Sequence, residues 1–179
     1  MPKVHVLLGC TASLLLLSCA HSYGLDRQMQ SGLLPPSATL YVTLPRPGRY
    51  DDTLYEMSGR QTGEAIVRAF APQVARVILG SRTESAEDAR ISAHAQNASH
   101  LVYPTIMHWE DRATEWSGVP DRVRVQIRIY DVTSGKLLDS AEVSGKSRWA
   151  TFGGDHPQEL LDRAVGDYVD LLFEGTIHQ

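Results

Sequence analysis

Two short stretches of this 179-residue chain concentrate the side chains that could do chemistry. The first, HWEDRATEWSGVPDR at residues 108–122, holds one histidine, four carboxylates and two tryptophans. The second, SGKSRWATFGGDHP at residues 144–157, contains the third tryptophan of the protein and a second histidine. Histidines with carboxylates can bind a metal or move protons, whereas aromatic side chains beside charged ones are typical of contact surfaces.

A metal site is one possibility for the 108–122 stretch. His108 and Glu110 are two positions apart on an expected strand, so their side chains share a face and could supply two ligands. His156 is the obvious third ligand, but no H-E-x-x-H motif and no cluster of histidines accompanies it. Ion pairs between this strand and arginines of the next strand are the favoured interpretation, at about 0.2–1 kcal/mol each. We therefore predict no metal and no cofactor.

Catalysis would need several reactive side chains to meet in one site, and the sequence does not indicate such a site. Gly153 and Gly154 precede an expected helix whose first N–H groups could hold an anion, but Asp155 as the N-cap residue would repel it. Ser140, Ser144 or Ser147 could form a triad with His156 and an aspartate, yet no G-x-S-x-G elbow is present. We predict a protein without enzymatic activity. The alternative is a hydrolase of an envelope polymer, in which at least two of these charged side chains would meet in one cleft.

The amino terminus predicts export. Lys3 gives a small positive region, and the apolar run at residues 4–17 is about 21 Å long as a helix, too short to cross a bilayer. Leu16-Leu17-Ser18-Cys19 resembles the lipobox of bacterial lipoproteins. That resemblance implies a signal peptide over residues 1–18 and acylation of Cys19 with chains such as palmitate. Two or more acyl chains anchor a protein stably.

The residue after the acylated cysteine bears on localisation. Ala20 stands where, by the same resemblance, an aspartate would retain a lipoprotein in the inner membrane. We therefore predict a lipid anchor in the outer membrane with the domain facing the periplasm. Because Cys10 would leave with the signal peptide and Cys19 would be acylated, the folded domain is expected to contain no thiol, disulfide or thiolate metal site.

Charge excludes one class of partner. Of the 17 Lys+Arg residues only Lys3 lies in the signal peptide, so the mature chain has 16 against 21 Asp+Glu, a net charge of −5. No basic patch is large enough to neutralise several phosphates of a nucleic acid, and we predict no nucleic-acid partner. Residues 19–37 are polar around an SGLLPPS segment, which predicts a flexible linker of up to about 60 Å, followed by one domain over 38–175.

Hydrophobic periodicity predicts an α+β two-layer sandwich with the order β-α-β-α-β-β-β-α. The strand at 122–132 is the clearest, because Val123, Val125, Ile127 and Ile129 alternate with polar residues. One apolar face needs a cover of helices, and the arginine-bearing face can meet water if the sheet is mostly antiparallel. The order resembles the amino-terminal domain of the Tol β-propeller protein and the outer-membrane lipoproteins that activate peptidoglycan synthases. The expected strands are 38–44, 75–80, 100–110, 122–132 and 136–147, and the expected helices are 58–70, 85–98 and 155–173.

The two stretches also carry a family resemblance. HWEDRATEWSG-PDR, YD--SGK and SGKS-W-TFGGDHP are similar to the signature of an uncharacterised lipoprotein family of Gram-negative bacteria, a domain of unknown function, over residues 38–173. The resemblance implies no activity, but it suggests that the two stretches meet at one end of the sheet. Together they define a candidate interaction surface, which consists of His108, Trp109, Glu110, Asp111, Arg112, Glu115, Trp116, Trp149, Phe152, Asp155 and His156.

The function predicted from the sequence is recognition rather than catalysis. The connection at 111–121 is longer than an ordinary hairpin, and Trp116 in its middle is either an exposed interaction anchor or a cover folded over the sheet. We expect a non-catalytic binding or assembly module of the cell envelope, whose partner is an envelope protein or glycan. The alternative is a structural accessory that self-assembles by pairing the edges of its sheet.

Overall fold

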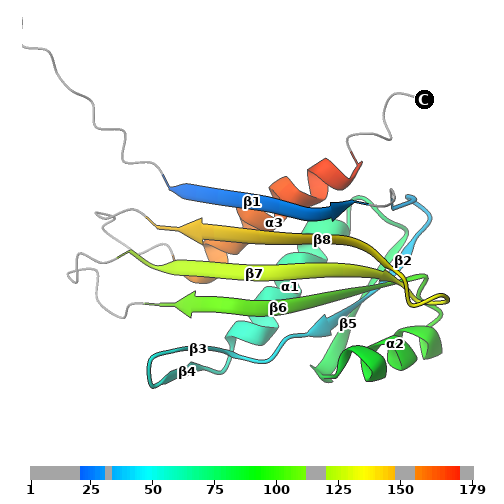
Figure 1. The fold of residues 1–179 in the computed structure, drawn as a ribbon, viewed down its shortest axis with the longest axis horizontal. Helices are drawn as coiled ribbons and strands as arrows, with labels where there is room; N and C mark the ends of the chain where they lie inside the picture. The colour runs from blue at the N-terminus through cyan, green and yellow to red at the C-terminus, as the bar shows by residue number, and fades with distance from the viewer. Residues whose placement is uncertain (1–20, 31–33, 112–119, 148–155, 174–179) are drawn as a thin grey trace, which may run out of the picture.

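The computed structural model describes residues 21–30, 34–111, 120–147 and 156–173. Three helices pack on a six-stranded sheet with the strand order β1-β8-β7-β6-β2-β5, and a small hairpin lies beside it (Figure 1). The sheet strands are β1 (Ser22–Gln30), β2 (Thr39–Leu44), β5 (Arg76–Thr83), β6 (His100–Glu110), β7 (Arg122–Asp131) and β8 (Leu137–Lys146). The hairpin is β3 (Gly48–Tyr50) with β4 (Thr53–Tyr55), and the helices are α1 (Ser58–Phe70), α2 (Ala86–Ala95) and α3 (Pro157–Phe173).

The predicted α+β class and element order are confirmed. Setting aside β1, β3 and β4, the chain runs β2-α1-β5-α2-β6-β7-β8-α3. The strands from β6 through β8 to β1 pair antiparallel, whereas β2 pairs parallel with both β5 and β6. The sheet is therefore antiparallel over most of its width and parallel at one side. None of the helices in the described ranges is long and apolar enough to cross a bilayer.

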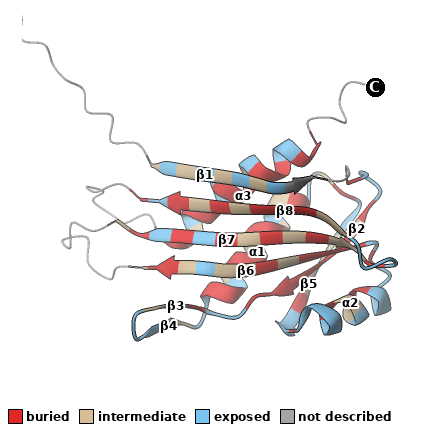
Figure 2. Ribbon diagram, viewed as in Figure 1, coloured by how far each residue is buried: buried red, intermediate tan, exposed pale blue. Residues whose placement is uncertain are grey.

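The main core lies between the sheet and the pair α1 and α3, which contact each other behind the strands (Figure 1). Figure 2 shows buried and more exposed residues alternating along β7, as the sequence pattern predicts, with Val123, Val125, Ile127 and Ile129 on the buried face. The helix α1 ends at Phe70, two residues before the proline that cannot continue it. Period-two burial in the strands and a buried stripe on each of α1 and α3 thus build one core.

The expectation that all helices cover one face is wrong for α2. Leu40 and Val102 belong to the main core, but their neighbours Tyr41 and Leu101 point to the other face of the sheet. There they meet Ala89 of α2 in a second, smaller cluster. The physical reason is the parallel part of the sheet: parallel strands are joined by crossover helices, which bury both faces. The rest of that face, over β1, β8 and β7, is the open face of the sheet.

The predicted flexible linker at 19–37 is wrong for its middle part. Residues 22–30 form β1, which pairs antiparallel with β8. From Ser22 to Gln28 the burial alternates at each step, with Tyr23 and Leu25 packed against the main core. Few apolar residues mark the strand in the sequence, and the next inward position after Leu25 is Arg27. Its charge is satisfied by an ion pair with Asp139 of β8, a partner that lies 112 positions away.

Pro104 lies in the middle of β6, a position that a proline can take only in an edge strand or at a bulge or where the ladder on its N–H side is missing. On one side β6 pairs with β7 at every described position from His100 to Ile106. On the other side the pairing with β2 covers only His100, Leu101 and Val102. On that second side no strand pairs with β6 at Pro104, so no backbone carbonyl there waits for the N–H group that proline lacks. A proline is tolerated in a sheet at such a position.

Candidate functional site

The structure places five of the eleven residues of the candidate interaction surface. His108, Trp109 and Glu110 lie at the end of β6, Asp111 follows it, and His156 immediately precedes α3. The remaining members, and the predicted lipidation site, lie outside the described residues: Cys19, Arg112, Glu115, Trp116, Trp149, Phe152 and Asp155.

The described residues at the ends of the 108–122 and 144–157 stretches lie close together. His156 Nδ1 is 3.4 Å from Asp111 Oδ1, so the start of α3 meets the end of β6. Asp121 and Ser147 join the same end from the other strands: the Ser147 N–H donates to the Asp121 carbonyl at 3.0 Å, and the Asp121 N–H donates to Ser147 Oγ at 2.8 Å. Because both stretches flank strands that end here, the antiparallel order brings them to one end of the sheet, the loop end.

Trp109 is wrongly included in the candidate surface, because it is a core residue with 1% of its surface exposed. The cause is a β-bulge in β6. Ile106 pairs with Val125, and His108 pairs with the neighbouring Arg124. Met107 is therefore an extra residue without a partner position in β7. The bulge returns Trp109 to the core face opposite Val123. Gly48 of β3 packs on it so closely that a methyl group there would lie 2.6 Å from Trp109 Cβ.

Glu110 is also wrongly included as a contact residue. Only 2% of it is exposed, and its carboxylate Oε2 is 3.1 Å from His108 Nε2. His108 in turn makes an edge-to-face contact with Tyr50 of the small hairpin, with ring centroids 5.3 Å apart. The predicted cross-strand pairing of this stretch with arginines takes a different form: His108 pairs within its own strand, and Arg124 pairs with Glu142 of β8 at 3.5 Å.

A groove of about 360 Å³ lies on the open face at the loop end. The register of the strands brings the residues of the groove together. One row across β1, β8, β7 and β6 consists of Ser22, Lys146, Arg122 and Glu110. The next row holds Gly24, Ser144, Arg124 and His108. The residues that line the groove are Ser22, His108, Arg122, Val123, Arg124, Ser144, Gly145 and Lys146.

The charge in this groove is predominantly positive. Arg122 and Lys146 are direct cross-strand partners, an arrangement of like charges that destabilises a sheet unless something compensates. Arg124 has an acidic partner in Glu142, but among the described residues neither Arg122 nor Lys146 forms an ion pair. Sequence reasoning noticed the arginines of β7 but not Lys146. Counting back from the turn at Gly135 would have placed Gly145 opposite Arg122, and a register shift between Ile129 and Tyr130 brings Lys146 there instead.

The described geometry at the loop end offers little for metal or acid–base chemistry. Within the described ranges no group of three or more histidine, cysteine or carboxylate side chains is arranged to hold a metal ion. Asp111 and His156 approach within hydrogen-bonding reach, but both are partly exposed and neither lines the groove. Glu110, the buried acid, is already engaged by His108.

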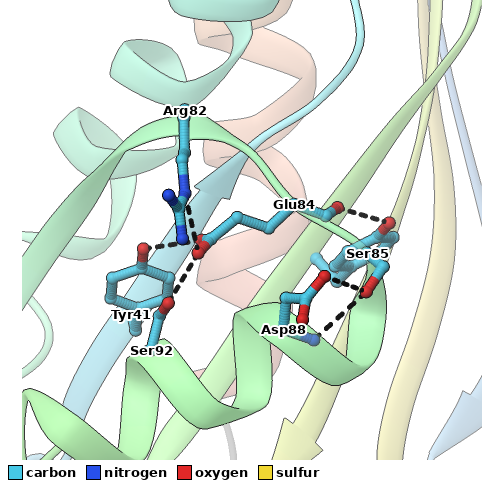
Figure 3. A network of polar contacts seen from close by, with 7 residues as sticks. Tyr41, Arg82, Glu84, Ser85, Asp88 and Ser92 are labelled. Carbon is cyan, nitrogen blue, oxygen red and sulfur yellow. Dashed lines mark hydrogen bonds and ion pairs between the residues drawn. The ribbon is translucent and has the colours of Figure 1, made fainter.

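A second polar cluster lies at the parallel side of the sheet, around Glu84 (Figure 3). The Glu84 carboxylate accepts hydrogen bonds from Tyr41 Oη at 2.8 Å and from Ser92 Oγ of α2, and Arg82 Nε lies 3.5 Å from it. Burial, followed by the hydrogen bond to Glu84, raises the pKa of Tyr41 to about 12. The sequence did not single out this acid, because the strand was expected to end at Gly80.

The Glu84 cluster is best understood as a fastening of α2. Ser85 caps this helix, because the Asp88 N–H donates to Ser85 Oγ at 3.2 Å. Glu84 also borders a groove of about 440 Å³ whose other side is formed by Pro45, Pro47 and Pro104. Since hydroxyl donors occupy both carboxylate oxygens, Glu84 positions the helix and has little capacity left for a ligand.

Comparison with known proteins identifies the fold and the family. Among curated proteins none matches the sequence. Of the solved structures, PelC from Paraburkholderia phytofirmans, crystallised as a dodecamer, is similar with a TM-score of 0.65 and 14% identity, over 86% of this chain and 97% of that chain. Protein XCC0632 from Xanthomonas campestris, of the family DUF330, gives 0.52 and 12%, over 84% and 94%.

A third similar structure is the lipoprotein GNA1162 from Neisseria meningitidis, with a TM-score of 0.51 and 14% identity, over 76% of this chain and 99% of that chain. At such identities the likeness shows a shared fold and no more. The family is instead assigned from the sequence, and the assignment confirms the expected membership of a family of unknown function. The model of the family described as a domain of unknown function, DUF4823, matches residues 33–172, and the chain belongs to this family.

Proposed function

We propose that this protein is an outer-membrane lipoprotein, anchored through acylated Cys19, whose periplasmic domain is a non-catalytic binding or assembly module. The observation that carries the proposal is the position of β1. This strand begins at Ser22, three residues after Cys19, and pairs with β8 along its length. A chain of three residues spans at most about 10 Å, so acyl chains at Cys19 would hold the sheet itself at the membrane.

Acylation at Cys19 is tested by labelling cells with a palmitate analogue. Cys19→Ala should abolish the label and release the protein from the membrane fraction. Cys10→Ala is the matched control, because it removes the other cysteine of the chain from within the predicted signal peptide and should leave the labelling unchanged. Labelling that survives Cys19→Ala would overturn the anchor.

The outer-membrane assignment has its own test. Ala20→Asp should move the protein to the inner-membrane fraction in a density gradient, because the resemblance to lipoproteins implies that an aspartate after the acylated cysteine retains them there. Ala20→Asn is the control for side-chain size. An inner-membrane location of the unchanged protein would contradict the proposal.

The non-catalytic role is supported by what the acidic side chains do. Glu110 and Glu84 are buried and engaged, and Asp111 and His156 meet at a partly exposed position outside the groove. A general acid or base must instead reach a substrate in a cleft. The loop end, with its groove and its two converging stretches, is the part of the described surface best suited to recognition of an envelope protein or glycan.

A photo-cross-linking residue at Val119, beside Trp116 in the 111–121 connection, tests recognition in intact cells. We expect one discrete adduct, identified by mass spectrometry and lost on Trp116→Ala. The same cross-linker at Lys136, in the turn at the far end of the sheet, is the control and should give no such adduct. Identical adducts from both positions would contradict recognition at the loop end.

Self-assembly is the second candidate function, favoured by the open sheet. β1 and β5 are edge strands, each paired on one side only, and PelC, which is similar in fold, is described as a dodecamer. Native mass spectrometry of the acylated protein in detergent would test it. A monomer over the accessible concentration range would exclude this alternative and leave the binding module.

A further inference from the structure

The basic groove at the loop end lies beside the predicted membrane anchor. Ser22, the first residue of β1, lines the groove and is the row partner of Lys146. Only Ala20 and His21 separate Ser22 from Cys19. Three residues of extended chain reach at most about 10 Å. An anchor at Cys19 therefore places Arg122 and Lys146 at the depth of the phospholipid headgroups.

We propose that this groove, through Arg122, Lys146 and Arg124, binds the phosphate groups of anionic phospholipids in the membrane that carries the anchor. The inference rests on the proposed acylation of Cys19, which brings the groove to the lipid surface. The ligand chemistry is a phosphate monoanion presented by a lipid headgroup.

The first argument is the uncompensated charge. Arg122 and Lys146 face each other across β7 and β8, and no described acid pairs with either. The nearest carboxylates are committed elsewhere: Glu110 to His108 at 3.1 Å, and Glu142 to Arg124 at 3.5 Å. A phosphate between the two cations would remove their repulsion and accept hydrogen bonds from both.

The second argument is the contrast with the rest of the chain. The mature protein carries a net charge of −5, so most of its surface is repelled by an anionic bilayer. Further along the open face, Asp26 lies directly opposite Glu142, and Glu142 is the partner of Arg124. Because Arg122 and Lys146 lie at the loop end, that end can approach an anionic membrane more closely than the rest of the domain.

The third argument concerns the shape of the groove. It is open to solvent on the exposed face, and besides its charged residues it is lined by Val123, Gly145 and the small side chain of Ser144. An open basic groove suits a headgroup that stays attached to a surface, whereas a free small anion is usually enclosed by several buried donors. The position beside Ser22 favours a lipid over a diffusing phosphate.

The test uses the mature chain, residues 19–179, with Cys19→Ser, so that no acyl chain contributes to binding. Its partition coefficient is measured at low ionic strength on vesicles of phosphatidylcholine alone and on vesicles containing phosphatidylglycerol. We expect binding only to the second kind, weakened by added salt. A basic residue near an anionic surface changes the partition coefficient by about five-fold, so Arg122→Gln with Lys146→Gln should weaken binding roughly 25-fold.

The matched control is Arg76→Gln with Lys136→Gln. It removes the same two charges from exposed positions at the far end of the sheet, and the partition coefficient should stay within two-fold. Equal losses in the two double variants, or equal binding to both kinds of vesicle, would overturn the proposal. Binding of inorganic phosphate without any binding to vesicles would overturn the assignment to lipid. Because the tested chain lacks Cys19, failure here is separate from failure of the acylation test.

Discussion

Arg27 and Asp139, 112 positions apart in the chain, form an ion pair of 2.6 Å that joins β1 to β8. The other carboxylate oxygen of Asp139 accepts a hydrogen bond from Tyr168 Oη of α3 at 2.7 Å. Asp139 is 1% exposed, and burial together with this carboxylate raises the pKa of Tyr168 above its ordinary value. One buried acid thus holds together the first strand, the last strand and the last helix.

Removing the Asp139 carboxylate should strongly destabilise the protein. Asp139→Ala leaves the Arg27 guanidinium and the Tyr168 hydroxyl without their partner, and breaking one side of a buried pair costs about 3–5 kcal/mol. Urea unfolding measures the loss. Asp162→Ala is the control, since its ion pair with Arg68 is half exposed and contributes about 0–1 kcal/mol. Equal losses in the two variants would show that the buried network is not special.

Two glycines near α3 should respond in opposite directions to alanine. A methyl group at Gly145 of β8 would lie 2.8 Å from Leu160 Cβ, so Gly145→Ala forces the helix away from the sheet at about 1–3 kcal/mol. A methyl group at Gly166, within α3, meets nothing within 4 Å. Gly166→Ala should therefore stabilise the protein by about 0.5–1 kcal/mol. The midpoints of thermal unfolding should shift in opposite directions, and a shared direction would refute this packing.

Trp109 should behave as a core residue in every assay. Trp109→Ala removes the largest fully buried side chain and should destabilise the protein by about 3–5 kcal/mol in urea unfolding. Met107→Ala, two residues earlier and 53% exposed, should change the stability by at most about 0.5 kcal/mol. A Trp109 variant that keeps its stability but loses a binding partner would instead return this residue to the contact surface.

His100 should make the stability fall as the pH is lowered. Burial lowers the pKa of His100, and Asp131, its partner across β7, opposes that shift only in part. The unfolded chain therefore takes up a proton near pH 6.5 that the folded protein resists. The contribution is fully present above that pH and is lost as the pH falls toward the folded pKa. His100→Gln should flatten the dependence between pH 7.5 and 5.5.

The control for this pH dependence is His94→Gln, which changes an exposed histidine of α2 and should leave the slope unaltered. Asp131 contributes at more acidic pH. Its hydrogen bonds from Ser134 lower its pKa, so its share of the stability is present above its unfolded pKa and lost only as the pH falls through the folded value. A wild-type slope in the His100 variant would contradict the assignment.

The strands and helices of the core could be predicted because their periodicity is strong. The alternation in β7 fixes which residues face inward, and Ser58 to Phe70 is bounded by a proline that the helix cannot pass. β1 could not be found in this way, since one of its inward positions is Arg27, and the acid that neutralises this arginine is apparent only in three dimensions. The side on which α2 packs depends on the handed crossover between parallel strands, which period-two patterns do not encode.

The candidate site was predicted in part. The meeting of Asp111 with His156 follows from the order of the strands, and the family resemblance pointed to it. The burial of Trp109 did not follow, because it depends on the bulge at Met107, which strict alternation does not contain. The basic groove needed the register of four strands at once, and even the pair formed by Arg122 and Lys146 depends on a register shift near the turn between β7 and β8.

The bulge at Met107 gives β6 one spare residue. Elsewhere in a paired strand the loss of a single residue moves every following side chain to the opposite face. Here Ile106 and His108 already occupy consecutive places against β7, opposite Val125 and Arg124. Deleting Met107 would therefore leave Trp109 inside and His108 on the open face, with a straighter strand between them. Homologous chains one residue shorter at this point should keep the same core, so length variation in this strand is expected at this position before any other.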